Sequence, residues 1–139
     1  MLQSGTQAPE FALPDHTGKN IELTQLLADG PLILYFYPSD FTPGCTKEAC
    51  VMRDMFTDLR SVGLQIAGVS PQDSDSHAKF RKEYRLPFTL LSDVDKVTIK
   101  MYEVDGPFGV GVRRATFLID QDRIIQDAVL ADVMISRHA

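Results

Sequence analysis

The order of apolar and polar positions predicts strands that alternate with helices. The unbroken apolar run at 32–37, Leu-Ile-Leu-Tyr-Phe-Tyr, is typical of a strand that is buried on both faces. Over 43–59 the apolar residues recur at spacings of three and four, which predicts a helix with one buried stripe formed by Ala49, Met52, Phe56 and Leu59. Gly63 then marks the end of this helix.

The remaining pattern continues the alternation and adds two hairpins. It predicts a strand at 64–69, a helix at 75–84, an antiparallel hairpin from 115–119 and 124–129, and a small N-terminal hairpin from 11–13 and 21–23. We therefore expect an α/β fold in which helices flank both faces of a central mixed sheet, with an N-terminal β-hairpin extension.

Composition and charge narrow the classes of partner. With 139 residues and 44% hydrophobic content, the chain has the size of a single domain, 1–139, with its own core. A net charge of -5 and scattered Lys and Arg residues argue against nucleic-acid binding. No apolar run reaches the roughly 18 residues that span a bilayer, and the N-terminus has no leader pattern. We expect a soluble, cytoplasmic protein that acts on small molecules or proteins.

The two cysteines, Cys45 and Cys50, are too few for a disulfide-built secreted scaffold, and their closeness favours redox or metal chemistry. The residues between them argue against a thioredoxin-type exchanger, which would have Cys-x-x-Cys. A zinc site would need further ligands, and His16, His77 and His138 are dispersed. We expect these histidines to lie on the surface, and we expect neither a metal nor a cofactor.

Cys45 falls in the first turn of the predicted helix 43–59, where free N–H groups and the helix dipole stabilise an anion. A thiol at such a position can act as a nucleophilic thiolate. Thr42 can point its hydroxyl at the Cys45 sulfur or at a bound substrate, while Pro38 and Pro43 stiffen the loop. Two alternatives stay open: Thr42 merely caps the helix, and Cys45 is a small buried apolar residue.

Pro38, Thr42 and Cys45 match the pattern P-x-x-x-T-x-x-C, and on this motif the chain resembles the peroxiredoxins. Other segments resemble the bacterioferritin comigratory subgroup, also called peroxiredoxin Q, namely 46–50, 68–70, 87–93 and 114–120. The resemblance covers nearly the whole chain. It implies a thioredoxin-like fold with an N-terminal extension, and reduction of hydrogen peroxide or organic hydroperoxides through a cysteine sulfenic acid.

The resemblance also implies roles for individual residues. Cys45 would be the peroxidatic cysteine, Thr42 would hold the peroxide by its hydroxyl, and Pro38 would exclude water. Arg114 matches the arginine that binds substrate, and a fixed guanidinium there would stabilise the thiolate and the leaving oxygen. Glu48 matches the glutamate that orients this arginine, through a bidentate pair.

Alternatives remain for the residues that the resemblance alone selects. Arg114 is also open to being an exposed strand arginine, like its neighbour Arg113, and Glu48 to being a solvated helix residue. Cys50 matches the resolving cysteine of members that carry both thiols on one helix, and the alternative is a structural thiol. Five helical residues separate two Cα atoms by roughly 8 to 9 Å, beyond the limit of about 7 Å for a disulfide. We therefore predict that the first turns of the helix unwind after oxidation.

The resemblance implies that thioredoxin or a similar thiol reductant recycles the disulfide, and that the chain is a monomer or a weak dimer. A non-enzymatic alternative is a peroxide sensor or chaperone-like interaction protein that uses the same cysteine pair. Relatives close with a longer C-terminal helix, whereas 131–139 is too short for a stable helix of its own. Two expectations stay open: that helix is truncated here, or the end of the chain docks elsewhere.

Overall fold

The computed structural model describes residues 1–130. In chain order its elements are β1 (Ala12–Pro14), β2 (Asn20–Glu22), α1 (Leu23–Leu26), β3 (Leu32–Phe36), α2 (Pro43–Ser61), β4 (Gln65–Ser70), α3 (Ser74–Glu83), β5 (Thr89–Ser92), α4 (Val97–Met101), the 3₁₀ turn η1 (Pro107–Gly109), β6 (Ala115–Ile119) and β7 (Ile125–Leu130). These bounds confirm both predicted hairpins, the strand–helix–strand–helix order in the middle of the chain, and a long helix that contains both cysteines.

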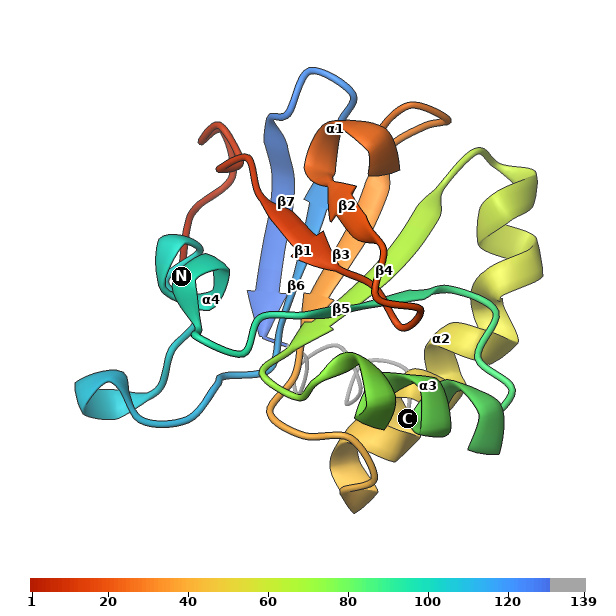
Figure 1. The fold of residues 1–139 in the computed structure, drawn as a ribbon. Coiled ribbons are helices and arrows are strands. Elements are labelled where there is room, and N and C mark those ends of the chain that lie inside the picture. Colours follow the sequence, from red (N-terminus) through yellow and green to blue (C-terminus); the bar gives the residue numbers. More distant parts are fainter. Residues whose placement is uncertain (131–139) are drawn as a thin grey trace.

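Five strands within residues 1–130 form one mixed sheet in the order β5-β4-β3-β6-β7, and β1 and β2 form a separate antiparallel pair (Figure 1). β3 is central, parallel to β4 and antiparallel to β6, so that Phe36 lies opposite Val69 on one side and Ala115 on the other. An antiparallel neighbour begins where a central strand ends. The loop after β3 and the residues before β6 therefore meet at one edge of the sheet.

Side chains of β3 alternate between two apolar clusters, one on each face of the sheet. Leu34 and Phe36 belong to a cluster that the N-terminal hairpin, α1 and α4 complete. Tyr35, and Tyr37 just after the strand, belong to a second cluster, which α2 and α3 complete. Figure 1 shows α2 and α3 together on one side of the sheet, with the β1–β2 hairpin on the other. The expected flanking by helices is confirmed, although α1 and α4 are short and the hairpin shares their face.

α2 follows the stripe that the sequence predicts. Ala49 and Met52 are buried, and Phe56 and Leu59 pack against the same cluster from its partly exposed margin. The helix ends at Ser61, and Gly63 has a φ of +87°, the left-handed conformation that commonly terminates a helix. The same stripe thus fixes which side of α2 faces the sheet, and with it the side of the cysteines.

The short elements α1, β5, α4 and η1 were not predicted, because runs of three to five residues carry too little periodicity to separate helix from strand. The expectation of a truncated C-terminal helix concerns 131–139 and lies outside the described residues. Within residues 1–130, no helix is both long enough and apolar enough to cross a membrane.

Candidate active site

The loop after β3 carries the motif residues to the edge of the sheet where β6 begins. It leads directly into α2, whose third residue is Cys45. Ala115, the first residue of β6, pairs with Phe36 at the end of β3, so the preceding residue, Arg114, lies beside the loop. The antiparallel register therefore brings together two segments that are far apart in the sequence.

Cys45 lies in the first turn of α2 with 1% of its surface exposed, and its thiol is not in a disulfide. The first backbone bond of the helix runs from the Thr46 N–H to the Thr42 carbonyl at 2.8 Å. The helix offers no carbonyl to the N–H groups of Gly44 and Cys45, which come earlier, and Pro43 has no N–H. These N–H groups and the positive end of the helix dipole stabilise negative charge beside the sulfur.

Tyr35 of β3 and Tyr37, just after the strand, share the apolar cluster that contains Cys45, and their rings stack with centroids 5.4 Å apart. Burial raises the pKa of Tyr35 well above its ordinary value, and the negative charge of Glu48 raises it further. Burial likewise raises the pKa of Tyr37. Both phenols therefore stay neutral, and they form an aromatic wall on the buried side of the Cys45 site.

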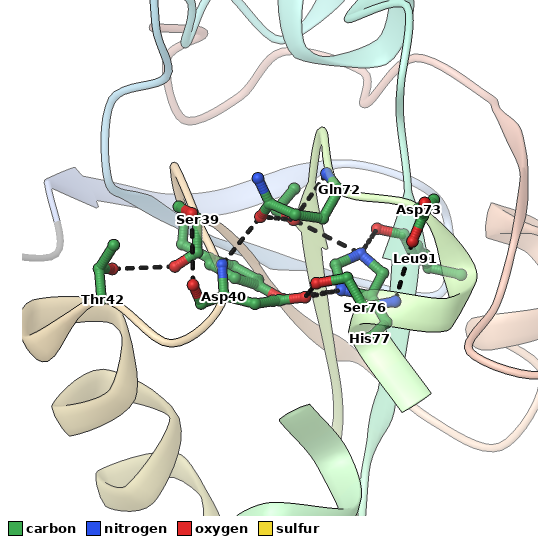
Figure 2. Close-up of polar contacts among 10 residues, drawn as sticks. Ser39, Asp40, Thr42, Gln72, Asp73, Ser76, His77 and Leu91 are labelled. Atoms are coloured by element: carbon green, nitrogen blue, oxygen red, sulfur yellow. Dashed lines mark hydrogen bonds and ion pairs between the residues drawn. The ribbon is translucent and has the colours of Figure 1, made fainter. Parts of the chain in front are cut away.

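Thr42 occupies the N-cap position of α2 with its backbone, but its side chain makes no capping hydrogen bond. The hydroxyl instead donates to the carbonyl oxygen of Ser39 at 2.9 Å (Figure 2). The alternative that the Thr42 side chain caps the helix is therefore wrong. With its proton given to Ser39, the Thr42 oxygen presents its lone pairs as acceptors for a proton of a bound molecule.

Arg114 lies against the first turn of α2. A Cβ built on Gly44 would stand 2.6 Å from the Arg114 Cζ, so the guanidinium occupies the space that glycine leaves next to Cys45. Arg114 is half-buried, whereas Arg113 is exposed. The alternative that Arg114 is an exposed strand arginine, like Arg113, is therefore wrong.

Glu48 and Pro38 flank the same site. Glu48 is 2% exposed, so the alternative of a solvated helix glutamate is wrong, and it lies one turn after Cys45 on α2. Pro38 is half-buried and lines a cavity of about 370 Å³ together with Val112, Arg113, Arg114 and Leu130. The cavity lies beside Arg114. The burial of Glu48 and the position of Pro38 do not test the roles predicted for these two residues, which stay predictions.

Cys50 lies on α2 as expected, half-buried and not in a disulfide. The helix runs without interruption from Pro43 to Ser61, so both cysteines stand on intact helix. Because their ideal Cα separation of roughly 8 to 9 Å exceeds disulfide length, this is a conformation in which the two sulfurs cannot bond. Partial exposure sets Cys50 apart from the buried apolar residues Ala49 and Met52.

The surface position expected for the histidines is wrong for His77, which has 0% of its surface exposed. Its Nδ1 lies 2.7 Å from Oδ2 of Asp40, in the active-site loop 37–42 between β3 and α2. His16 is half-buried, and His138 lies outside the described residues. The sequence predicted a helix at 75–84, and only the tertiary contact with Asp40 shows that the His77 ring is buried. Among residues 1–130, no group of three or more His, Cys, Asp or Glu side chains could hold a metal.

Comparisons with known proteins agree on one group. Residues 4–128 match the model of the AhpC/TSA family. The chain is 41% identical to a peroxiredoxin bcp of Coxiella burnetii over 99% of this chain and 93% of that protein. It is 40% identical to the chloroplastic peroxiredoxin Q of Gentiana triflora over 90% of this chain, but spans 58% of that longer protein. The crystal structure of peroxidoxin BcpB from Mycobacterium tuberculosis superposes with a TM-score of 0.89 at 38% identity, covering 95% of this chain and 88% of that one.

Proposed function

Because the chain belongs to the AhpC/TSA family, we propose that Cys45 is its peroxidatic cysteine and that Cys50 resolves the oxidised form as an intramolecular disulfide. Membership gives the chain the thioredoxin-like fold of the peroxiredoxins and makes it a thiol-dependent peroxidase, an oxidoreductase. Its substrates are hydrogen peroxide and organic hydroperoxides. The assignment of each step to a residue is the proposal.

The first step oxidises Cys45. Its thiolate attacks the terminal oxygen of the peroxide, an S–O bond forms and the O–O bond breaks, giving Cys45 sulfenic acid and a hydroxide or alkoxide that takes up a proton. The Thr42 oxygen holds the peroxide by accepting a hydrogen bond from its O–H group, because the Thr42 hydroxyl already donates its own proton to Ser39. The Arg114 guanidinium and the first N–H groups of α2 stabilise the charge that moves to the leaving oxygen. Pro38 excludes water from the pocket.

The second step oxidises Cys50. Its sulfur attacks the sulfenic sulfur, a disulfide forms, and the sulfenic oxygen leaves as water. The intact α2 holds the two sulfurs too far apart, so its first turns unwind before the bond forms. A dithiol reductant of the thioredoxin type then exchanges with the disulfide and restores both thiols.

The placement of Arg114 against Gly44 is the observation that carries this proposal. It puts a cation against Gly44 in the first turn of α2, next to Cys45, while Thr42 supplies an acceptor from the N-cap position of the same helix. A buried sulfur with a helix dipole, a guanidinium and an oriented hydroxyl around it is suited to O–O cleavage. Glu48, buried one turn further along α2, orients Arg114.

The remaining expectations belong to the same proposal. The reductant is thioredoxin or a similar dithiol protein, and the chain acts as a monomer or weak dimer in the cytoplasm, without a nucleic-acid or membrane partner. The acidic net charge of -5 supports the absence of a nucleic-acid partner. The partial exposure of Cys50 supports a resolving thiol that an external reductant can reach once the disulfide has formed.

Turnover of peroxide with thioredoxin, thioredoxin reductase and NADPH tests the proposal on the wild type, Cys45→Ser and Cys50→Ser. Wild type should consume many peroxides per chain, and Cys45→Ser none. Cys50→Ser should be oxidised once and then stop at the sulfenic acid or a higher oxidation state. Full turnover by Cys45→Ser would contradict the proposal, and a wild type that is oxidised once without turnover would favour a sensor.

A further inference from the structure

A buried polar network lies behind the active-site loop and ties it to α3 and β5 (Figure 2). Asp40 Oδ2 lies 2.7 Å from His77 Nδ1, with the His77 and Asp40 side chains 0% and 1% exposed. Asp40 Oδ1 accepts the Tyr37 hydroxyl at 2.6 Å, and Oδ2 also accepts the Ser76 hydroxyl at 2.8 Å. None of the steps above uses these groups, although Asp40 belongs to the loop that carries Thr42.

The partners of His77 determine which ring nitrogens carry protons. Nδ1 faces the Asp40 carboxylate, and Nε2 lies 3.0 Å from the Leu91 carbonyl oxygen. An ionised Asp40 and a backbone carbonyl are both acceptors, so this arrangement favours a ring that donates from both nitrogens. Ser70 Oγ lies 3.4 Å from Nε2, but it gives its single proton to Gln72 Oε1 at 3.0 Å. With Asp40 ionised, the geometry thus favours an imidazolium between a carboxylate and a carbonyl.

Other titratable groups also face His77. Tyr37, from the loop that follows β3, has its hydroxyl 3.4 Å from Nδ1. Burial raises the pKa of this phenol, so it remains a donor to Asp40. The charge of His16, from the turn between β1 and β2, interacts with that of His77. Asp40 is thus the carboxylate in direct contact with the ring within the described residues.

One peptide unit connects this network to Thr42. The N–H of Asp40 donates to Gln72 Oε1 at 2.8 Å, which also fixes the orientation of the Gln72 amide. The carbonyl of the same peptide, on Ser39, accepts the Thr42 hydroxyl at 2.9 Å. Because a peptide unit is planar, holding Asp40 by its N–H and its carboxylate sets the direction of the carbonyl that orients Thr42.

The backbone between the network and α2 is strained. Phe41, which is not a glycine, has a φ of +66°, in the left-handed region. Its ring contacts that of Phe80 on α3, with centroids 5.1 Å apart. Such a conformation persists where its surroundings hold it, and here the Asp40 anchor on one side and α2 on the other hold it.

We propose that His77 is a positioning residue of the peroxidase: its imidazolium anchors Asp40, and through the Ser39–Asp40 peptide it fixes the Thr42 hydroxyl for the attack of Cys45 on peroxide. The inference rests on the proposed function. The anchor points lie on α3 and β5, outside the helix that unwinds, so the loop keeps its attachment while the first turns of α2 open. His77 therefore acts on the oxidation of Cys45 and not on the formation of the disulfide.

His77→Gln tests the proposal by separating the two steps. The chain has no Trp, so rapid mixing with peroxide, quenching by a thiol-alkylating reagent and mass spectrometry report the loss of the Cys45 thiol and the appearance of the disulfide. We expect the second-order rate constant of Cys45 oxidation to fall about tenfold or more, while the rate of disulfide formation from the sulfenic acid stays the same or rises. Unchanged rate constants, or a fall of both by one common factor, would overturn the proposal.

Controls separate positioning from general loss of structure. His16→Gln makes the same chemical change at a histidine outside the network and should leave both rate constants as in wild type. The double variant Asp40→Asn with His77→Gln removes both charges, and should oxidise slowly like the single variant even where it is the more stable of the two. A double variant that oxidises at the wild-type rate would contradict a positioning role.

A measurement on the wild type covers the case in which His77→Gln does not fold. ¹⁵N NMR of the imidazole should show a proton on both His77 nitrogens at the pH of the kinetic assay, and a ring with a single proton would overturn the proposal. The two failures are distinguishable. A wild type that is not oxidised at Cys45 overturns the proposed function and this inference with it, whereas normal oxidation of both wild type and His77→Gln overturns this inference alone.

Discussion

Gly44→Ala should separate catalysis from stability, because the missing side chain of Gly44 makes room for Arg114. An alanine Cβ would stand 2.6 Å from the Arg114 Cζ, against the 3.4 Å at which ordinary contact begins. The guanidinium must therefore retreat by roughly 1 Å, a displacement that in an active site costs on the order of 100-fold in rate. The group that has to move is the flexible end of the Arg114 side chain, so the fold itself loses little stability.

The expected effect on stability is small and of the opposite sign. Gly44 lies inside α2 and its φ is not in the left-handed region, so alanine fits the backbone. Alanine in a helix is favoured over glycine by up to about 1 kcal/mol. We therefore expect a free energy of unfolding equal to or above that of wild type, together with a much slower oxidation of Cys45.

The assay combines urea unfolding with the rapid-quench measurement of Cys45 oxidation at several peroxide concentrations. Lys47→Ala, an exposed change in the next turn of the same helix, serves as the matched control and should keep the wild-type rate. A Gly44→Ala variant that is folded and oxidises as fast as wild type would refute the role given to Arg114, since the guanidinium could not then be needed where the structure places it.

Three further changes give separate tests. Thr42→Val removes the hydroxyl that donates to Ser39 and should slow Cys45 oxidation about 100-fold or more, whereas Thr42→Ser should keep most of the rate; equal rates in both would contradict the role of the hydroxyl. Tyr35→Phe removes a buried hydroxyl that has no hydrogen-bond partner among residues 1–130, so the free energy of unfolding should be unchanged or rise by about 1 kcal/mol, and a clear loss would reveal a missed partner. Burial, and then the charge of Arg81, lower the pKa of His16 below 6.5. The unfolded chain therefore binds a proton before the folded protein does, and stability is lost as the pH falls below that value. In urea unfolding, His16→Gln should make the free energy of unfolding fall less steeply with falling pH, and an unaltered dependence would contradict this reasoning.

The sequence predicts the long, periodic and strongly apolar elements well. The strand 32–37 and the helix 43–59 carry enough residues to show their period, and the structure places β3 and α2 there. The four-residue strand β5 could not be read in this way, since its burial comes from pairing with β4 and not from a pattern of its own. Boundaries shift by a residue or two where caps, and not hydrophobicity, end an element.

The candidate site was predictable in part. The spacing of Thr42 and Cys45 relative to a helix start is local, so the sequence shows it directly. The contact of Arg114 with Gly44 depends on the antiparallel register of β3 and β6, and the sequence alone did not separate Arg114 from Arg113. The burial of His77 is a tertiary property of the same kind, because nothing in the polar stretch around it shows that an aspartate of another loop meets the ring.

Mass spectrometry after one equivalent of hydrogen peroxide tests the central claim most directly. The wild type should lose two hydrogen atoms and yield a peptide that links Cys45 to Cys50, while Cys50→Ser should carry one added oxygen on Cys45 and Cys45→Ser should remain unmodified. An added oxygen on Cys50 in the Cys45→Ser variant at the wild-type rate, or a wild type without the internal disulfide, would contradict the account.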